Sequence, residues 1–260
     1  MNRLQKTFQE LRANNEKAFV PYIMAGDGGI NGFKDRVIFL EKCGATAIEI
    51  GIPFSDPVAD GPTIQDAGIR ALKEGVTLKD VLQAVAELRP IVSIPLVLMT
   101  YMNPIYAYGI GSFIIEAKKA GVDGCIIPDL PIEEEEMIAP HLEDAGMELI
   151  RLVTLTSPIE RIEAISKRGN GFLYAVTVTG ITGARTTFNE SIGDYLNRLK
   201  EVSPIPVLAG FGISTPEQVV EMSQFCDGVV VGSKIVELFH ENKHDEIAKL
   251  VQAFKEVNVG

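Results

Sequence analysis

Hydrophobic residues recur at two alternating spacings from one end of this chain to the other. Short runs of apolar, often β-branched residues alternate with longer stretches in which an apolar residue recurs every three or four positions. Such short runs are typical of parallel strands buried on both faces, whereas the longer stretches predict amphipathic helices. Strands are expected at residues 18–24, 46–51, 94–100, 124–127, 148–154, 171–177, 206–209 and 228–231.

Helices are predicted before the first strand and between the strands. Leu4, Phe8 and Leu11 give residues 2–14 an apolar stripe, which we expect to lie over one end of a core. Further helices are expected at residues 31–43, 111–120, 133–145 (with an acidic first turn) and 244–256, and in stretches that begin at Thr77, Ser157, Thr215 and Ser233.

Capping signals support two of these helix starts. Thr77 is followed three residues later by Asp80, which is the spacing of a capping box. Ser157 is expected to cap its helix, with Pro158 at the first helical position and Glu160 as the capping partner.

Eight strands alternate with helices in a chain of 260 residues, without a linker or a change of composition. That number of βα units is usual for a (β/α)8 barrel of about 250 residues. A doubly wound open sheet is the alternative, but it favours a Gly-x-Gly-x-x-Gly motif after the first strand, and residues 26–29 do not supply one. The sequence therefore predicts one α/β domain over residues 1–260, a single TIM barrel with an extra N-terminal helix.

Composition limits the classes of partner and compartment. A formal net charge of -11 argues against nucleic acid or an anionic membrane surface as the main partner. The N-terminus has no apolar targeting segment, and no run approaches the length of a membrane span. Cys43, Cys125 and Cys226 are widely spaced and lie in or beside apolar runs, so we interpret them as reduced, buried thiols of a cytoplasmic protein.

Two carboxylates stand out in residues 48–62. Glu49 falls on the opposite face of its strand from Ile48 and Ile50, so if these isoleucines cover a core, Glu49 points to whatever the other face encloses. Asp60 follows on a proline-rich loop, which can hold a second carboxylate across one substrate. On spacing alone, a structural ion pair and a turn-forming aspartate explain the two acids equally well.

Glycines follow the last two predicted strands, where barrel enzymes commonly hold phosphate. Gly210, Phe211 and Gly212 follow the seventh strand, and Gly232 and Ser233 follow the eighth. Backbone N–H groups there can approach an oxyanion, and a helix that begins at Ser233 would direct further N–H groups at it. Each glycine taken singly is better explained by a simple turn, but two such loops after the two expected strands favour phosphate.

The loop at residues 179–187 follows the sixth strand and is rich in polar residues and glycine. Thr182 and Gly183 could complete a phosphate site there, and the loop could close over a substrate. Arg185 in the same loop could bind an anion or remain solvated. An ordinary surface loop is the alternative.

Other strand ends carry groups that could line a pocket for a flat apolar ring, although such a residue taken singly is more often plain core. These candidates are Tyr22, Tyr101, Ile126 and Tyr174, with Asp129, Ile150 and Ile213 at further strand ends. Arg151 lies inside the fifth predicted strand, and it either reaches outward to solvent or pairs with a carboxylate.

Metal and covalent chemistry have little support. The three histidines, at positions 141, 240 and 244, fall in predicted helices, away from the strand ends where barrel enzymes place their sites. Lys234 is the lysine nearest a strand end, but it follows the proposed phosphate loop, so a Schiff base there is disfavoured. Acid–base catalysis by carboxylates remains.

Several motifs identify a family resemblance that spans essentially the whole chain. They are residues 48–62, Phe19-Val20-Pro21-Tyr22, Pro128-Asp129-Leu130-Pro131, Thr154-Leu155-Thr156-Ser157-Pro158, Thr182-Gly183-Ala184 and Gly210-Phe211-Gly212-Ile213. In type and spacing they resemble the tryptophan synthase alpha chain family. Tyr22 departs from the phenylalanine of many members, and Gly28 replaces a usual proline, so the first loop is expected to be looser.

The resemblance implies reversible retro-aldol cleavage of indole-3-glycerol phosphate to indole and glyceraldehyde 3-phosphate. It implies that Glu49 and Asp60 are the catalytic acids, and that this chain needs no metal or organic cofactor. The family works as an α2β2 complex whose beta chain carries pyridoxal phosphate and condenses indole with serine.

Within that reaction the two acids are expected to differ. Glu49 in an apolar barrel mouth should have a raised pKa that suits it to proton transfer at indole C3 and at the adjacent hydroxyl. Asp60 should stay ionised and accept a hydrogen bond from the indole N–H.

Two other functions compete with an alpha chain in a two-protein synthase. They are a freestanding lyase that releases indole and a catalytically silent barrel that regulates a partner. The presence of both acids argues against the silent barrel, and an exposed Phe54-Ser55-Asp56 favours a partner. Docking is expected on the catalytic face, at Phe54, Asp56, Asn103, Pro104 and residues 129–131. The alternative is local loop packing, with Phe54 folded inwards.

Overall fold

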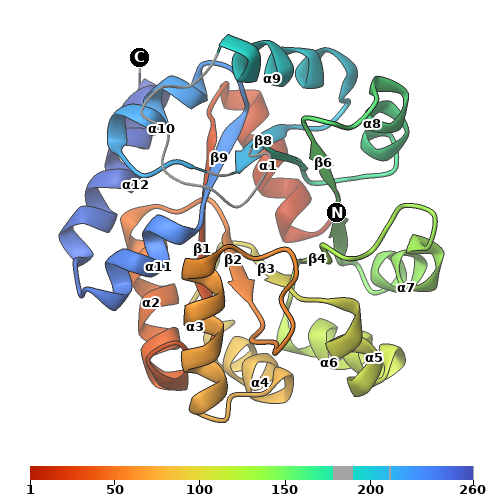
Figure 1. Ribbon diagram of the computed structural model, residues 1–260, viewed down its shortest axis with the longest axis vertical. Coiled ribbons are helices and arrows are strands. Elements are labelled where there is room, and N and C mark those ends of the chain that lie inside the picture. The colour runs from red at the N-terminus through yellow and green to blue at the C-terminus, as the bar shows by residue number, and fades with distance from the viewer. Residues whose placement is uncertain (178–189, 211, 260) are drawn as a thin grey trace.

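The strands form one parallel, nearly closed barrel with helices around it (Figure 1). The computed structural model describes residues 1–177, 190–210 and 212–259. Its strands follow the spatial order β5-β4-β3-β2-β1-β9-β8-β7-β6. They are β1 (Ala18–Met24), β2 (Ile48–Gly51), β3 (Leu96–Met99), β4 (Gly124–Ile126), β5 (Glu148–Ile150), β6 (Leu152–Thr154), β7 (Leu173–Val176), β8 (Val207–Gly210) and β9 (Gly228–Val231).

The nine strands occupy the eight positions of a (β/α)8 barrel, because β5 and β6 are halves of one predicted strand. Only Arg151 separates them. β5 pairs with β4, and β6 pairs with β7, so the broken strand joins the two ends of the sheet order. The predicted fold class is confirmed.

Several strands are shorter than the apolar runs that predicted them. Pro95 and Pro206 precede β3 and β8 and have no N–H to give to a ladder. Gly171 has a φ of 87°, so the chain cannot continue as a strand through it, and β7 begins at Leu173.

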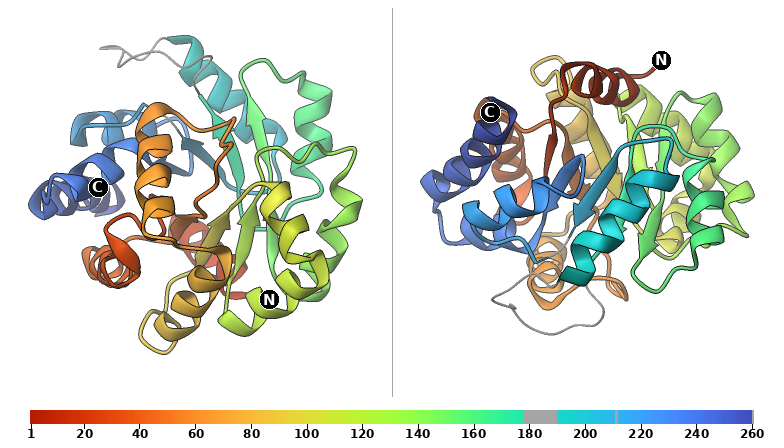
Figure 2. Two further views of the ribbon diagram at one scale, coloured as in Figure 1. Left: turned by 60° about the horizontal axis from the view of Figure 1, so that its bottom comes forward. Right: turned by 90° about the horizontal axis from the view of Figure 1, so that it is seen from above.

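Helices surround the barrel, and one of them covers its N-terminal end. They are α1 (Arg3–Asn14), α2 (Gly29–Cys43), α3 (Pro62–Lys73), α4 (Leu78–Leu88), α5 (Met102–Tyr108), α6 (Ile110–Ala120), η1 (Glu135–Met137), α7 (Ala139–Asp144), α8 (Ile159–Ser166), α9 (Glu190–Val202), α10 (Pro216–Ser223), α11 (Ser233–His240) and α12 (His244–Val259). The predicted N-terminal helix is confirmed as α1. Its Leu4 and Phe8 pack into the barrel interior with Val20 and Phe172. Figure 2, right, shows α1 at the end of the barrel opposite α3.

Two helix predictions were wrong in detail. The continuous helix at residues 133–145 is instead η1 followed by α7. Pro140 explains the break, because proline fits only the first turn of a helix and interrupts one that is already running. Ser157 does not cap α8, which begins at Ile159; its hydroxyl accepts a hydrogen bond from the Thr154 N–H at 3.1 Å.

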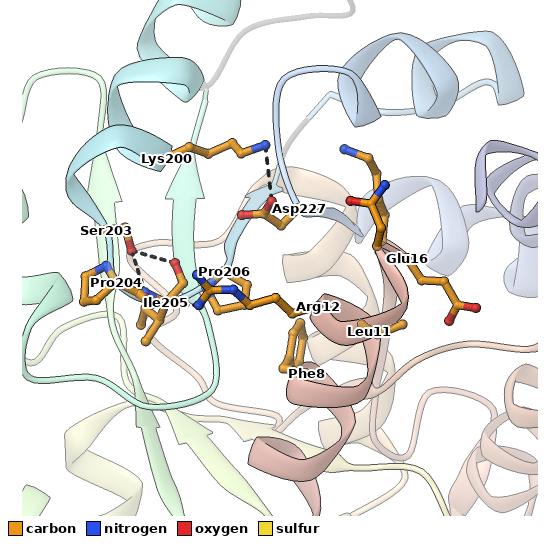
Figure 3. A pocket seen from close by; sticks show the side chains of 12 residues that line it. Phe8, Leu11, Arg12, Glu16, Lys200, Ser203, Pro204, Ile205, Pro206 and Asp227 are labelled. Atoms are coloured by element: carbon orange, nitrogen blue, oxygen red, sulfur yellow. Dashed lines mark hydrogen bonds and ion pairs between the residues drawn. The ribbon is translucent and has the colours of Figure 1, made fainter. Parts of the chain in front are cut away.

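A cavity of about 230 Å³ opens at the N-terminal end of the barrel, between α1 and the segments before β8 and β9 (Figure 3). Phe8 and Leu11 form part of its apolar wall. Lys200 pairs with Asp227 at 3.3 Å on its opposite side. In barrels of this class the N-terminal face contributes stability, whereas the chemistry lies at the C-terminal face.

No helix in the described part of the chain is long and apolar enough to cross a membrane.

Candidate active site

Glu49 points into the barrel interior at its C-terminal mouth. Ile48 and Ile50 pack outward, in the core between strands and helices, while Ala47 lies in the inner core. Glu49 shares the side of the strand with Ala47 and is only 2% exposed. In the register of the sheet it lies beside Tyr22 of β1. The predicted direction of the glutamate is therefore confirmed.

Enclosure changes the chemistry of Glu49. Burial, and to a smaller extent the nearby negative charge of Asp60, raise the pKa of its carboxyl group to about 8. A group with this pKa is mostly protonated at neutral pH, so Glu49 can donate a proton there and take one back.

Asp60 has a polar partner that Glu49 does not share. The Tyr101 hydroxyl donates a hydrogen bond to the Asp60 carboxylate at 3.0 Å, and accepts one from the Ala59 N–H at 3.0 Å. Burial raises the pKa of Asp60 to about 6, while the hydrogen bond from Tyr101 acts to lower it. Asp60 is therefore mostly ionised at neutral pH and Glu49 is not.

The Tyr101 ring also fixes the position of Phe54. The two ring centroids are 5.4 Å apart, and Phe54 is only partly exposed. The expectation of an exposed Phe54 was therefore wrong: its ring packs inward because Tyr101 offers an aromatic face. Asp56 beside it is exposed, as are Asn103 and Asp129.

Two glycines make room for tyrosine rings in the mouth. A Cβ on Gly51 would lie 1.9 Å from the Tyr22 hydroxyl oxygen, and a Cβ on Gly210 would lie 2.3 Å from the Tyr174 ring. Both tyrosines are buried, and burial followed by nearby carboxylate charge raises their pKa values. The charges of Asp60 and Glu49 both act to raise the pKa of Tyr22, so this ring and the two carboxylates lie near one another in the mouth.

The predicted phosphate site is described only in part. Gly212 has a φ of 74°, which glycine adopts without strain. Gly232 is the N-cap of α11, so this helix begins at Ser233 as predicted and its first N–H groups face the mouth. Phe211, Thr182, Gly183 and Arg185 lie outside the described residues.

The remaining strand-end candidates lie in different surroundings. Ile126 and Ile150 are buried in the inner core, and Ile213 is buried outside the strands. Asp129 accepts a hydrogen bond from the Met102 N–H at 3.0 Å, at the start of α5. Arg151 pairs with Glu135 at 2.7 Å, which decides between its two alternatives.

Sequence reasoning missed two features of the mouth. One is the hydrogen bond from Tyr101 to Asp60, because Tyr101 was considered only as pocket lining. The other is Asp27, which was considered only as part of a glycine turn; it is 2% exposed and contacts two arginines. The position of Asp27 shortly after β1 was the signal in the sequence that could have identified this carboxylate as part of the mouth.

No cluster of three potential metal ligands occurs among the described residues. His141, His240 and His244 lie in α7, α11 and α12, as predicted.

Comparison with known proteins points to one family. The family model for the tryptophan synthase alpha chain matches residues 8–259. The tryptophan synthase alpha chain of Bacillus mycoides is 58% identical over 243 residues, which cover 94% of each chain. That of Bacillus cereus strain ZK is 55% identical over 256 residues, 98% of each chain.

Solved structures agree with the sequence comparison. Tryptophan synthase subunit alpha from Legionella pneumophila is similar with a TM-score of 0.89 and 36% identity, over 98% of this chain and 99% of that one. A tryptophan synthase structure from Mycobacterium tuberculosis has a TM-score of 0.89 and 34% identity, over 97% and 98%.

Proposed function

This chain belongs to the tryptophan synthase alpha chain family, whose activity is cleavage of indole-3-glycerol phosphate, and we propose that Glu49 and Asp60 carry out that cleavage. The observation that supports this assignment best is the pairing of two carboxylates with different pKa values in one barrel mouth. Glu49 is enclosed and its pKa is about 8, whereas Asp60 is hydrogen-bonded and its pKa is about 6.

Glu49 acts as the proton carrier. Breaking the bond between indole C3 and the side chain requires a proton at C3 and loses one from the adjacent hydroxyl as the aldehyde forms. Protonated Glu49 delivers the first, and the resulting carboxylate accepts the second, so the residue returns to its starting state. Such proton transfer contributes roughly 10²–10⁴-fold to the rate.

Asp60 stabilises the charge that develops on the ring. It accepts a hydrogen bond from the indole N–H, and protonation at C3 makes the ring cationic. An ionised Asp60 therefore stabilises the transition state more than the bound substrate. Tyr101 holds the carboxylate, because its hydroxyl bridges Asp60 and the Ala59 N–H.

The rest of the mouth binds the substrate. Tyr22, Tyr101, Ile126 and Tyr174 line the space for the indole ring. Phosphate is held by the backbone N–H groups of Gly210, Phe211, Gly212, Gly232 and Ser233, with Thr182 and Gly183 completing the site. The start of α11 favours an anion because its first N–H groups have no partner inside the helix.

The chain pairs with a tryptophan synthase beta chain, as its family does, and the finer details of that assembly are proposals. We propose an α2β2 complex in which residues 1–260 act as one domain and the beta chain carries pyridoxal phosphate. Indole passes directly to that second site for condensation with serine. The alpha chain uses no cofactor of its own. Its described cysteines are all free thiols, which suits the reducing cytoplasm.

Indole release with and without a beta chain tests the function. We expect slow cleavage of indole-3-glycerol phosphate by the chain alone and faster turnover in the complex. Equal rates in both conditions would indicate a freestanding lyase. A chain that released no indole in either condition, but still changed the activity of the beta chain, would be a silent regulator, and the proposed roles of Glu49 and Asp60 would be wrong.

A further inference from the structure

Asp27 is a buried carboxylate between two arginines at the mouth of the barrel. It follows β1, and its side chain is 3% exposed. Arg70 of α3 donates two hydrogen bonds to it, from Nε at 2.7 Å and from Nη2 at 2.9 Å. Arg36 of α2 approaches the same carboxylate to 3.5 Å. We call these three residues the Asp27 cluster.

Arg70 connects the cluster to the helix that follows Asp60. α3 begins at Pro62, two positions after Asp60. The Gln65 side chain in its first turns donates a hydrogen bond to the Asp60 carbonyl oxygen at 2.8 Å. Any shift of α3 therefore moves the backbone that carries the catalytic aspartate.

α3 forms a wall of the mouth. Its buried face, with Ile64 and Ala67, packs against Tyr22 and Met24 of β1 and against Val236 of α11. These apolar contacts hold α3 through shape and burial, which do not depend on direction as a hydrogen bond does. A bidentate guanidinium–carboxylate pair is directional, since both N–H bonds must meet both oxygens.

Arg36 extends the cluster towards the helix proposed to bind phosphate. Its guanidinium lies over the Phe239 ring of α11, 5.0 Å from the ring centroid. The Asp27 cluster thus joins the β1 loop, α2, α3 and α11, which surround the same side of the mouth.

We propose that Asp27 and Arg70 are positioning residues for catalysis, holding α3 so that Asp60 keeps its place opposite Glu49. This inference rests on the proposed catalytic role of Asp60. Neither residue is assigned contact with substrate. Their two hydrogen bonds add a directional restraint against sliding of α3 along the mouth to the apolar packing of that helix.

A second cluster of the same kind provides a matched control at the other end of the barrel. Asp123 precedes β4, is 4% exposed, and pairs with Arg3 of α1 and Arg89 after α4. Arg89 donates to it at 3.0 Å. Both clusters hold one carboxylate between two arginines, but only the Asp27 cluster adjoins the mouth.

The test compares Arg70→Gln with Arg89→Gln in steady-state cleavage of indole-3-glycerol phosphate. Arg70→Gln should lower kcat about ten- to a hundredfold, because small misplacements of a catalytic group have large effects on rate. Binding of inorganic phosphate should stay within about twofold, since Arg36 still holds Asp27 beside α11. Arg89→Gln should lower thermal stability but leave kcat within about twofold.

Two further variants test the same role, so that the test does not depend on the folding of Arg70→Gln alone. Arg70→Lys keeps the charge without the two parallel hydrogen bonds, and should retain the fold while losing most of the same kcat. Asp27→Asn should lose kcat to the same degree. If Arg70→Gln does not fold, the comparison is made with Arg70→Lys instead.

A double-mutant cycle separates this inference from the function on which it rests. If Arg70 acts through Asp60, adding Arg70→Gln to Asp60→Asn should lower kcat by less than about twofold more. Additive losses of kcat in the double variant would overturn the positioning role. It would also be overturned if Arg70→Lys and Arg70→Gln both had the kcat of the parent. A normal kcat for Asp60→Asn alone would instead contradict the proposed function.

Discussion

At the scale of single residues, the surroundings of Glu49 and Asp60 decide what each carboxylate can do. Enclosure in the apolar interior makes Glu49 a weak acid that keeps its proton at neutral pH. The hydroxyl of Tyr101 opposes the effect of burial on Asp60 and favours its charged form. One barrel mouth can therefore present a proton donor and an anion to the same ring.

The rate of cleavage should show a bell-shaped dependence on pH. Asp60 must be charged, so kcat should fall as the pH drops below about 6. Glu49 must begin protonated, so kcat should also fall as the pH rises above about 8. Tyr101→Phe removes a hydrogen bond that lowers the pKa of Asp60, so the acidic limb should move to higher pH. A pH profile of kcat for both proteins measures this, and an unmoved acidic limb in Tyr101→Phe would contradict it.

Glu49 should also make the fold less stable in alkaline solution. Its pKa in the folded state, about 8, lies above the ordinary value of 4.5. A raised pKa means that its favourable contribution is fully present below the unfolded value and is lost as the pH rises through the folded value. Glu49→Gln cannot ionise, so its free energy of unfolding should exceed that of the parent by a few kcal/mol, on the order of 3, at pH 9.

Denaturant unfolding of both proteins at pH 5 and pH 9 measures that difference. The advantage of Glu49→Gln should be larger at pH 9. Equal differences at the two pH values would show that Glu49 is not desolvated as described.

At the scale of elements, the apolar pattern predicted most strands and helices, because the spacing of apolar residues within a segment already shows which of its faces can be buried. β1 and β9 begin and end where their apolar runs do. The pattern failed where a contact distant in sequence decides the backbone. The broken strand between β5 and β6 is an example, since Arg151 turns to Glu135, which sequence spacing does not reveal. Pro140, in contrast, was a visible signal against a continuous helix.

The candidate site likewise has features that the sequence predicts and contacts that it does not. Glu49 was predictable from strand alternation and from the family resemblance, and the start of α11 from its glycine. The hydrogen bond from Tyr101 to Asp60 spans 41 positions, and Arg70 reaches Asp27 over 43. No single-sequence periodicity reports contacts of that separation.

Glu135 holds a structural element, η1, in place through charge, and no role in catalysis is proposed for it. It is 6% exposed and accepts hydrogen bonds from Arg151 at 2.7 Å and Arg168 at 2.8 Å, which tie η1 to the barrel. Glu135→Gln leaves two arginines without their carboxylate, so unfolding free energy should fall by about 2 kcal/mol, less than for a fully buried pair because Arg168 is half exposed. Denaturant unfolding measures this loss, and kcat is the control: a large loss of kcat with unchanged stability would reverse the assignment.

At the scale of the whole molecule, the two ends of the barrel are specialised differently. The acids, the tyrosines and the start of α11 share the C-terminal mouth, while α1 closes the other end (Figure 2). In the proposed complex, a partner that receives indole is expected to dock on the loops of the mouth. Val58, 81% exposed in the loop that carries Asp60, is an apolar group suited to such contact.

Substitutions in that loop should weaken the complex. Asp56→Ala removes an exposed carboxylate, and Phe54→Ala removes the ring that packs on Tyr101. We expect weaker binding of the beta chain for both, measured by calorimetry, and less stimulation of indole release. Ile115→Ala, at an exposed position on α6 outside the loop, is the control. Unchanged binding and stimulation in both loop variants would show that the partner docks elsewhere.

The most direct test of the central claim is turnover and binding measured on the same purified Glu49→Gln protein. Glutamine keeps the shape of the side chain but cannot carry the proton, so indole release should be abolished, a loss of at least about 10²-fold. Inorganic phosphate should bind as it does to the parent, since the backbone groups around α11 are unchanged. Near-normal cleavage by this variant would contradict the account, and loss of phosphate binding together with activity would make Glu49 a structural residue.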